Sequence, residues 1–133
     1  MKRIFLGFIL VIVLQACSEK LGMNGVANTK WVLSEWPGQT MPSTTKKATL
    51  NFDADHKVSG KSFCNGFGGM ATIDGDKIKI GELIGTMMYC EDVGQAESKY
   101  TEGLKSVDSF KIVDDKLQLL KGGQLVMVFT KAE

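Results

Sequence analysis

The chain has 133 residues, of which 44% are hydrophobic and 23% are charged, and its 16 basic residues nearly balance its 15 acidic ones. This length and composition indicate one domain, long enough to bury a hydrophobic core. The near-zero net charge, without a basic tract interleaved with aromatic residues, excludes a typical nucleic-acid-binding protein. The pair Lys46-Lys47 is expected to be a solvated loop.

The first residues have the organisation of an export signal. Met1-Lys2-Arg3 is a short basic start, and residues 4–14 form an unbroken apolar run. As a helix this run would be about 16 Å long, which is too short for a bilayer core that needs about 20 apolar residues. A basic start, a short apolar run and a small residue before a cut are typical of a secretory signal. We therefore expect residues 1–16 to be a signal peptide.

The segment Leu14-Gln15-Ala16-Cys17 resembles the lipobox of bacterial lipoproteins. This resemblance implies that the chain is cut before Cys17, that Cys17 carries a diacylglycerol thioether, and that its amine is then often acylated. Two or more acyl chains anchor a protein stably in a membrane. Ser18, in place of Asp, implies the outer membrane, with the domain facing the periplasm. An ordinary signal with a chance cysteine and an uncleaved anchor helix are the alternatives.

Removal of residues 1–16 leaves two cysteines besides Cys17, namely Cys64 and Cys90. An exported protein meets oxidising conditions, in which such a pair usually forms a disulfide. The loop of about 26 residues would give roughly 3.5 kcal/mol of stability in the chain-entropy model. Metal binding is the rival interpretation, but two cysteines fall short of the four ligands of a structural zinc site.

The elements are expected in the following order. Residues 17–29 are the lipidated cysteine and a polar, glycine-rich tether, and residues 30–133 are the folded domain. A short strand over residues 30–33 precedes a loop over residues 35–45, which contains two prolines. Period-two alternation and turn residues predict further strands over residues 48–53, 57–63, 70–73, 77–80, 109–113, 116–120 and 124–131.

One segment, residues 91–107, departs from this alternation. Its inward positions recur every three or four residues, which predicts a helix with one inward stripe. The stripe consists of Val93, Ala96, Glu97, Tyr100, Leu104 and Val107. The last strand is apolar on both faces, so it is expected to be covered on both sides. These elements predict a mainly β (α+β) fold, a curved antiparallel sheet with one helix packed against it.

Several short motifs in residues 58–104 together resemble the META domain, and most closely the HslJ-like lipoproteins. Ser59-Gly60 resembles the end of a family strand, and Cys64 and Cys90 belong to the two cysteine motifs, CN-x-F-x-G and T-x-M-x-C. The other matching positions are Asn65, Phe67, Gly69, Thr86, Met88, Glu97, Tyr100 and Leu104. Relatives commonly carry arginines where this chain has Gly66 and Met87, so a role of those arginines is in doubt here.

The resemblance implies a partly open antiparallel β-barrel with one helix. It also implies an envelope-associated protein linked to stress or antibiotic tolerance, with no established catalytic activity. The implied fold is similar to that of pilot lipoproteins that help secretins insert. No catalytic residue, metal or cofactor is expected.

Three other patterns point to chemistry only superficially. Residues 66–71 fit G-x-G-x-x-A, but a strand rather than a helix is expected to follow them, unlike in a dinucleotide site. Asn51, Asp53 and Asp55 have the spacing of a calcium loop but lack its glycine and its final glutamate. His56, the single histidine, is expected in an exposed turn.

Glu97 falls on the inward stripe, where a carboxylate needs partners. We expect it to be a hydrogen-bond anchor, with a ligand contact at the mouth of the sheet as the alternative. Two functions follow for the whole chain. It is a non-enzymatic envelope module that acts through a protein partner, or it binds an apolar ligand such as a lipid acyl chain inside the curved sheet. Small residues such as Ala48, Gly60, Ala71 and Ala96 would favour the second function, and bulky interior side chains would oppose it.

Overall fold

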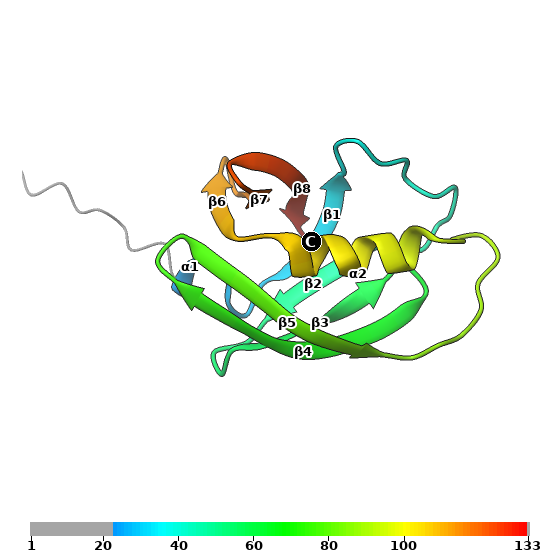
Figure 1. Cartoon of the computed structure of the whole chain (residues 1–133), viewed down its shortest axis with the longest axis horizontal. Coiled ribbons are helices and arrows are strands. Elements are labelled where there is room, and N and C mark those ends of the chain that lie inside the picture. Colours follow the sequence, from blue (N-terminus) through cyan, green and yellow to red (C-terminus); the bar gives the residue numbers. More distant parts are fainter. Residues whose placement is uncertain (1–22, 133) are drawn as a thin grey trace, which may run out of the picture.

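Eight antiparallel strands form one sheet that closes into a ring, because the first strand pairs with the last (Figure 1). The computed structural model describes residues 23–132, so the predicted signal peptide and Cys17 lie outside the described residues. The strands are β1 (Lys30–Glu35), β2 (Thr49–Phe52), β3 (Lys57–Ser62), β4 (Asn65–Asp74), β5 (Lys77–Gly85), β6 (Ser109–Val113), β7 (Lys116–Lys121) and β8 (Gln124–Lys131). The helices are the single turn α1 (Met23–Val26) and α2 (Ala96–Ser106). The predicted mainly β fold with one long helix is confirmed.

The ring has one narrow seam, between β5 and β6. These strands share a single opposed pair, Lys77 and Ser109, whereas the hairpin of β4 and β5 pairs over most of its length. Helix α2 lies between the half of the ring formed by β2–β5 and the half formed by β6–β8 and β1 (Figure 1). The helix packs mainly on β5 and β3.

Bulky side chains fill the interior of the ring. The largest of them are at most 1% exposed: Trp31, Phe52, Tyr100, Phe110 and Phe129. A fully buried side chain of this kind contributes about 1.5–3 kcal/mol through removal of apolar surface from water. On β8, Met127 and Phe129 belong to the core, and Val128 between them is also buried, as expected for a strand covered on both sides.

Several expected boundaries were wrong, since β1 runs to Glu35 instead of residue 33 and β5 runs to Gly85 instead of residue 80. Strand β4 begins at Asn65 instead of Met70, because glycines interrupt the alternation that predicts strands. Helix α2 begins at Ala96, and the preceding residues 91–95 form a turn in which Gly94 has a φ of 53°.

The expected tether over residues 17–29 was also given an end too late in the chain. Val26 is 1% exposed and belongs to the core. Its carbonyl accepts a hydrogen bond from the Trp31 indole at 3.2 Å, and Ala27 forms a β-bridge with Phe52. Residues 23–28 are therefore part of the domain rather than of a spacer. Among residues 23–132, no helix combines the length and the apolar character needed to cross a membrane.

Three hairpins turn on residues with left-handed backbone conformations. Gly75 has a φ of 61° between β4 and β5, and Gly122 and Gly123 have φ values of 56° and 80° between β7 and β8. The turn between β6 and β7 instead uses Asp114 and Asp115, with φ values of 53° and 61°. Two positive values in a two-residue loop match the type I′ turn, in which glycine is preferred at the second position.

Asp115→Gly is therefore expected to raise the free energy of unfolding by about 0.5–1 kcal/mol, because glycine adopts this conformation without steric cost. The ion pair of Asp115 with Lys131 is exposed, and its loss should matter little. Urea denaturation would measure the change. Asp76→Gly is the matched control, since Asp76 occupies a hairpin turn without a positive φ. Glycine gains nothing there, so this variant should be less stable than the wild type. A destabilised Asp115→Gly variant would contradict this account.

Candidate functional site

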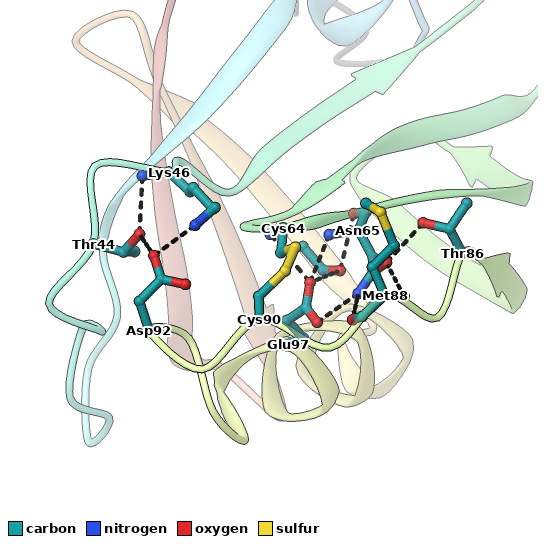
Figure 2. The surroundings of a disulfide bond; sticks show 10 residues. Thr44, Lys46, Cys64, Asn65, Thr86, Met88, Cys90, Asp92 and Glu97 are labelled. Atoms are coloured by element: carbon teal, nitrogen blue, oxygen red, sulfur yellow. Dashed lines mark hydrogen bonds and ion pairs between the residues drawn. A yellow bond between two sulfur atoms is a disulfide. The ribbon is translucent and has the colours of Figure 1, made fainter.

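Most of the predicted motif residues come together where β4 begins, beside the N-terminus of α2 (Figure 2). The chain reaches this place through a tight turn after β3, in which Phe63 has a φ of 71°. Cys64 and Asn65 follow directly, and the segment after β5, residues 86–90, passes alongside them. Hydrogen bonds and a disulfide join these segments to the helix. We call this set of residues the clasp: Cys64, Asn65, Thr86, Met88, Cys90 and Glu97.

Asn65 holds the passing segment with its side-chain amide. Its Nδ2 donates to the Met88 carbonyl at 2.9 Å, and its Oδ1 accepts from the Met88 backbone N–H at 2.8 Å. Nδ2 also donates to Glu97 Oε2 at 2.7 Å, and Oδ1 also accepts from the Thr86 hydroxyl at 2.8 Å. A primary amide has two donor hydrogens and two acceptor positions. Asn65 is 6% exposed, and all of this capacity is used within the protein.

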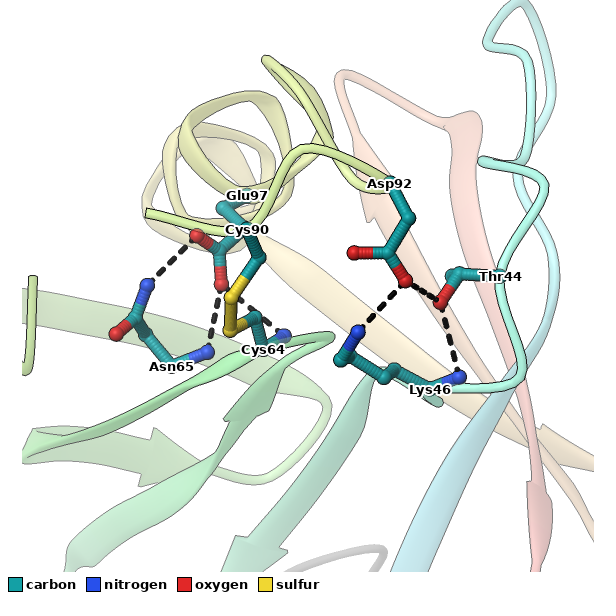
Figure 3. A network of polar contacts seen from close by, with 7 residues as sticks. All are labelled: Thr44, Lys46, Cys64, Asn65, Cys90, Asp92 and Glu97. Carbon is teal, nitrogen blue, oxygen red and sulfur yellow. Dashed lines mark hydrogen bonds and ion pairs between the residues drawn. A yellow bond between two sulfur atoms is a disulfide. The ribbon is translucent and has the colours of Figure 1, made fainter. Parts of the chain in front are cut away.

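Glu97 joins the turn at Cys64 and Asn65 to the first turn of α2. Its Oε1 accepts from the Asn65 backbone N–H at 2.6 Å and from the Cys64 backbone N–H at 3.1 Å (Figure 3). The Ser62 hydroxyl also donates to Oε1, at 3.3 Å. A carboxylate in the first turn also suits the positive end of the helix dipole. These contacts agree with the expected hydrogen-bond anchor, since both carboxylate oxygens have protein partners.

The disulfide predicted between Cys64 and Cys90 is present in the structure, beside the Glu97 carboxylate (Figure 2). It closes the loop that contains the long hairpin of β4 and β5. The described residues contain no group of three His, Cys, Asp or Glu placed to hold a metal ion.

A smaller polar group extends the clasp toward the loop before β2. The Asp92 carboxylate accepts from Lys46 Nζ at 2.6 Å and from the Thr44 hydroxyl at 2.5 Å (Figure 3). The hydrogen bond from Lys46, followed by the one from Thr44, holds the pKa of Asp92 below its ordinary value. This group ties the loop of residues 36–48 to the segment that follows Cys90.

The remaining motif residues serve the core. Tyr100 and Leu104 on α2 are 0% exposed. The Tyr100 ring lies at the centre of an aromatic cluster, 6.0 Å from the Phe67 ring and 5.9 Å from that of Phe63 between centroids. Gly69 has no room for a side chain, because a Cβ there would lie 2.5 Å from the Glu82 carbonyl oxygen. The predicted motif residues thus lie in the clasp, in the core beside α2, or, for Gly69, at a close approach of two strands.

The patterns that only superficially indicated chemistry have ordinary structural places. Residues 66–71 lie within strand β4, without the helix that a dinucleotide site needs. Asp53 Oδ1 accepts from the backbone N–H groups of Asp55 and Lys57, both at 2.9 Å, and so shapes a hairpin turn. His56 is exposed in that turn, as expected.

One feature of the site was missed by the sequence analysis. The clasp fixes the backbone of residues 86–89 while their large side chains point into solvent. Met87 is 96% exposed, Met88 is 60% exposed and Tyr89 is 89% exposed. The consecutive Met-Met-Tyr run was the available signal in the sequence. We call residues 87–89 the apolar ridge.

The family model for the META domain matches residues 24–133, so the chain belongs to the META domain family. An NMR structure of a protein from Burkholderia xenovorans is 26% identical, with a TM-score of 0.69 over 83% of this chain and 86% of that one. A second NMR structure is 19% identical, with a TM-score of 0.63 over 80% of this chain and 92% of that one. A DUF4847 family protein from Bacteroides vulgatus is 14% identical, with a TM-score of 0.59 over 81% and 95%. No curated protein matches the sequence.

Asn65→Ala is expected to lower the free energy of unfolding by about 2–4 kcal/mol, because four hydrogen bonds of about 0.5–1.5 kcal/mol each are lost. Asn51→Ala removes the same side chain from β2, where no side-chain hydrogen bond to a described residue depends on it, and should cost less than about 0.5 kcal/mol. If chemical denaturation shows that Asn65→Ala and Asn51→Ala lose the same free energy of unfolding, the hydrogen bonds of the Asn65 amide do not contribute to stability.

Tyr100 gives a pH dependence. Burial raises its pKa well above the ordinary value of 10.0, while its hydroxyl donates to the Thr49 carbonyl at 2.9 Å. Above pH 10, the unfolded chain loses the Tyr100 phenol proton while the folded chain keeps it. The free energy of unfolding therefore falls as pH rises, by up to about 1.4 kcal/mol per pH unit. Tyr100→Phe should be less stable at neutral pH and lack this slope. Tyr89 is exposed, so Tyr89→Phe should show the same pH dependence of stability as the wild type. Parallel curves of unfolding free energy against pH for the wild type and both variants would show that Tyr100 does not cause the slope.

Proposed function

We propose that this META domain chain is an exported, HslJ-like lipoprotein, anchored through Cys17 in the outer membrane and facing the periplasm. It is not an enzyme, and it acts by holding a protein partner on the apolar ridge. Its biological setting is envelope stress and drug tolerance, as the family resemblance implies. The lipobox supports the anchor, and a disulfide at the centre of the clasp suits a protein that folds in an oxidising compartment.

The observation that carries the proposal is the exposure of the apolar ridge on a fixed backbone. Contiguous exposed apolar side chains mark interaction sites, and methionine and aromatic residues are enriched in protein interfaces. Binding usually costs free energy to order the contacting segment. Here the Asn65 amide and the disulfide have already ordered residues 86–90, so less of that cost falls on association.

An apolar ligand inside the ring is the weaker alternative. The interior is occupied by large aromatic and aliphatic side chains. Of the small residues that would favour a cavity, Gly60 has no free space beside it, since a Cβ there would lie 2.2 Å from the Thr49 carbonyl oxygen, and Ala48 and Ala71 are buried in the core. A pilot-like assembly role is a special case of the partner hypothesis and would use the same ridge.

A photo-crosslinking amino acid at position 87 or 89, in the full chain expressed in cells, tests the proposal. We expect a discrete crosslinked protein species from both positions in intact envelopes. Val113, an exposed apolar residue on β6, is the matched control position and should give none. Asn65→Ala, which frees the ridge, should lower the yield by about tenfold if ordering is worth about 1.4 kcal/mol.

Crosslinks to lipid alone, or equal yields from positions 87 and 113, would overturn the partner role. The anchor is checked on the same material. The wild-type chain should carry a lipid mass and remain with the membranes, and Cys17→Ser should lose both properties. If deletion of the gene leaves envelope stress and drug tolerance unchanged, the proposed setting fails even where a partner is found.

A further inference from the structure

A basic groove crosses the outer face of the ring over strands β2–β5. It is open and has a volume of about 890 Å³. Four lysines line it, Lys30, Lys46, Lys47 and Lys61, and its lining contains no acidic residue. Lys30, the pair Lys46-Lys47 and Lys61 come from three separate segments, and the pairing of the strands brings these segments together. Lys30 lies opposite Asn51 of β2, and Asn51 lies opposite Ser59 of β3.

Glycines make this face concave. Gly66 of β4 lies opposite Lys61, and Gly68 lies opposite Ser59, so two successive outward positions of β4 carry no side chain. A Cβ at either glycine would make only ordinary van der Waals contact, no closer than 3.7 Å, with the backbone of β3. Of these two glycines, Gly66 lines the groove, so a bound group can approach the backbone of β4 closely at that position.

The charge of the groove is largely uncompensated. Lys46 is paired with Asp92. The other ion pairs among residues 23–132 are those of Lys105 with Glu82 and of Lys131 with Asp115, both outside the groove. Lys30, Lys47 and Lys61 are exposed and have no carboxylate partner among the described residues. Three lysines that converge on an open floor attract a compact anion.

An apolar side chain stands beside this charge. Ile84, which lies opposite Gly68 on β5, also lines the groove and is 82% exposed. The two aromatic side chains of the lining, Phe63 and Phe67, are buried and offer no ring on which a nucleic-acid base could stack. The groove thus has lysines and an exposed isoleucine side by side in its lining. This combination suits an anionic headgroup joined to a hydrocarbon chain.

We propose that this groove binds the phosphate-bearing headgroup of an anionic phospholipid. The phosphate lies among Lys30, Lys47 and Lys61, and the first carbons of an acyl chain lie against Ile84. This site is distinct from the apolar ridge, and the inference holds whether or not the ridge has a protein partner.

The test places the full chain in nanodiscs of phosphatidylcholine, with and without phosphatidylglycerol, and measures the acylation rate of each lysine by peptide mass spectrometry. We expect Lys47 and Lys61 to be protected when phosphatidylglycerol is present. Lys116 and Lys121 on β7, in the other half of the ring, should react equally in both discs (Figure 1). Lys47→Gln should reduce the protection of Lys61 about fivefold, the equivalent of about 1 kcal/mol per lysine near an anionic surface. Lys121→Gln, with the same change of charge, should leave it unchanged.

Three outcomes would overturn the proposal. Equal rates at Lys47 and Lys61 in the two kinds of disc would show that the groove ignores the headgroup. Equal protection of Lys116 and Lys121 would show a general surface effect instead of a site. If inorganic phosphate added to phosphatidylcholine discs protects as well as phosphatidylglycerol does, the ligand is free phosphate and the lipid is not required. Unchanged circular dichroism of each variant would show that folding is intact.

Discussion

The hydrogen bonding of one buried amide, that of Asn65, determines how the open end of this ring is built. Its donors and acceptors are the same groups that a peptide unit offers, and it holds the N–H and C=O of Met88 as a neighbouring strand would. The remaining donor and acceptor reach Glu97 and Thr86, so α2 and the segment after β5 are joined through one side chain. Because a buried polar group without a partner costs about 1–3 kcal/mol, each of these residues constrains the identity of the others.

Sequence patterns predicted the fold best where alternation was plain. The expected bounds of β6 and β8 agree with the structure, and the disulfide and the inward position of Glu97 were anticipated. The patterns failed where glycines replace side chains, as at the start of β4, because a strand without side chains shows no alternation. They also failed at Val26, since a short apolar segment that packs on a distant tryptophan has no local signature.

The basic groove and the apolar ridge both depend on contacts between residues far apart in the sequence, which composition does not reveal. Lys30, Lys47 and Lys61 are separated in the sequence. Lys47 follows another lysine, and the pair Lys46-Lys47 was expected to be an ordinary solvated loop. The register of β1, β2 and β3 brings the segments of Lys30 and Lys61 to one face, and Lys47 directly precedes β2. The exposure of Met87 likewise follows from the Asn65 contacts with its neighbours rather than from the hydropathy of the segment, which would place methionine inside.

The closure of the ring also has a consequence for the order of folding. Strand β1 completes its pairing only with β8, where Leu33 lies opposite Phe129, so the last contact joins the two ends of the domain. Hairpins such as that of β4 and β5 are local and can form early, but closure carries the loop entropy of nearly the whole domain, which slows folding. The native ring therefore cannot close until the residues of β8 are available to pair with β1, and any shorter N-terminal part of the domain keeps an unpaired edge on β1.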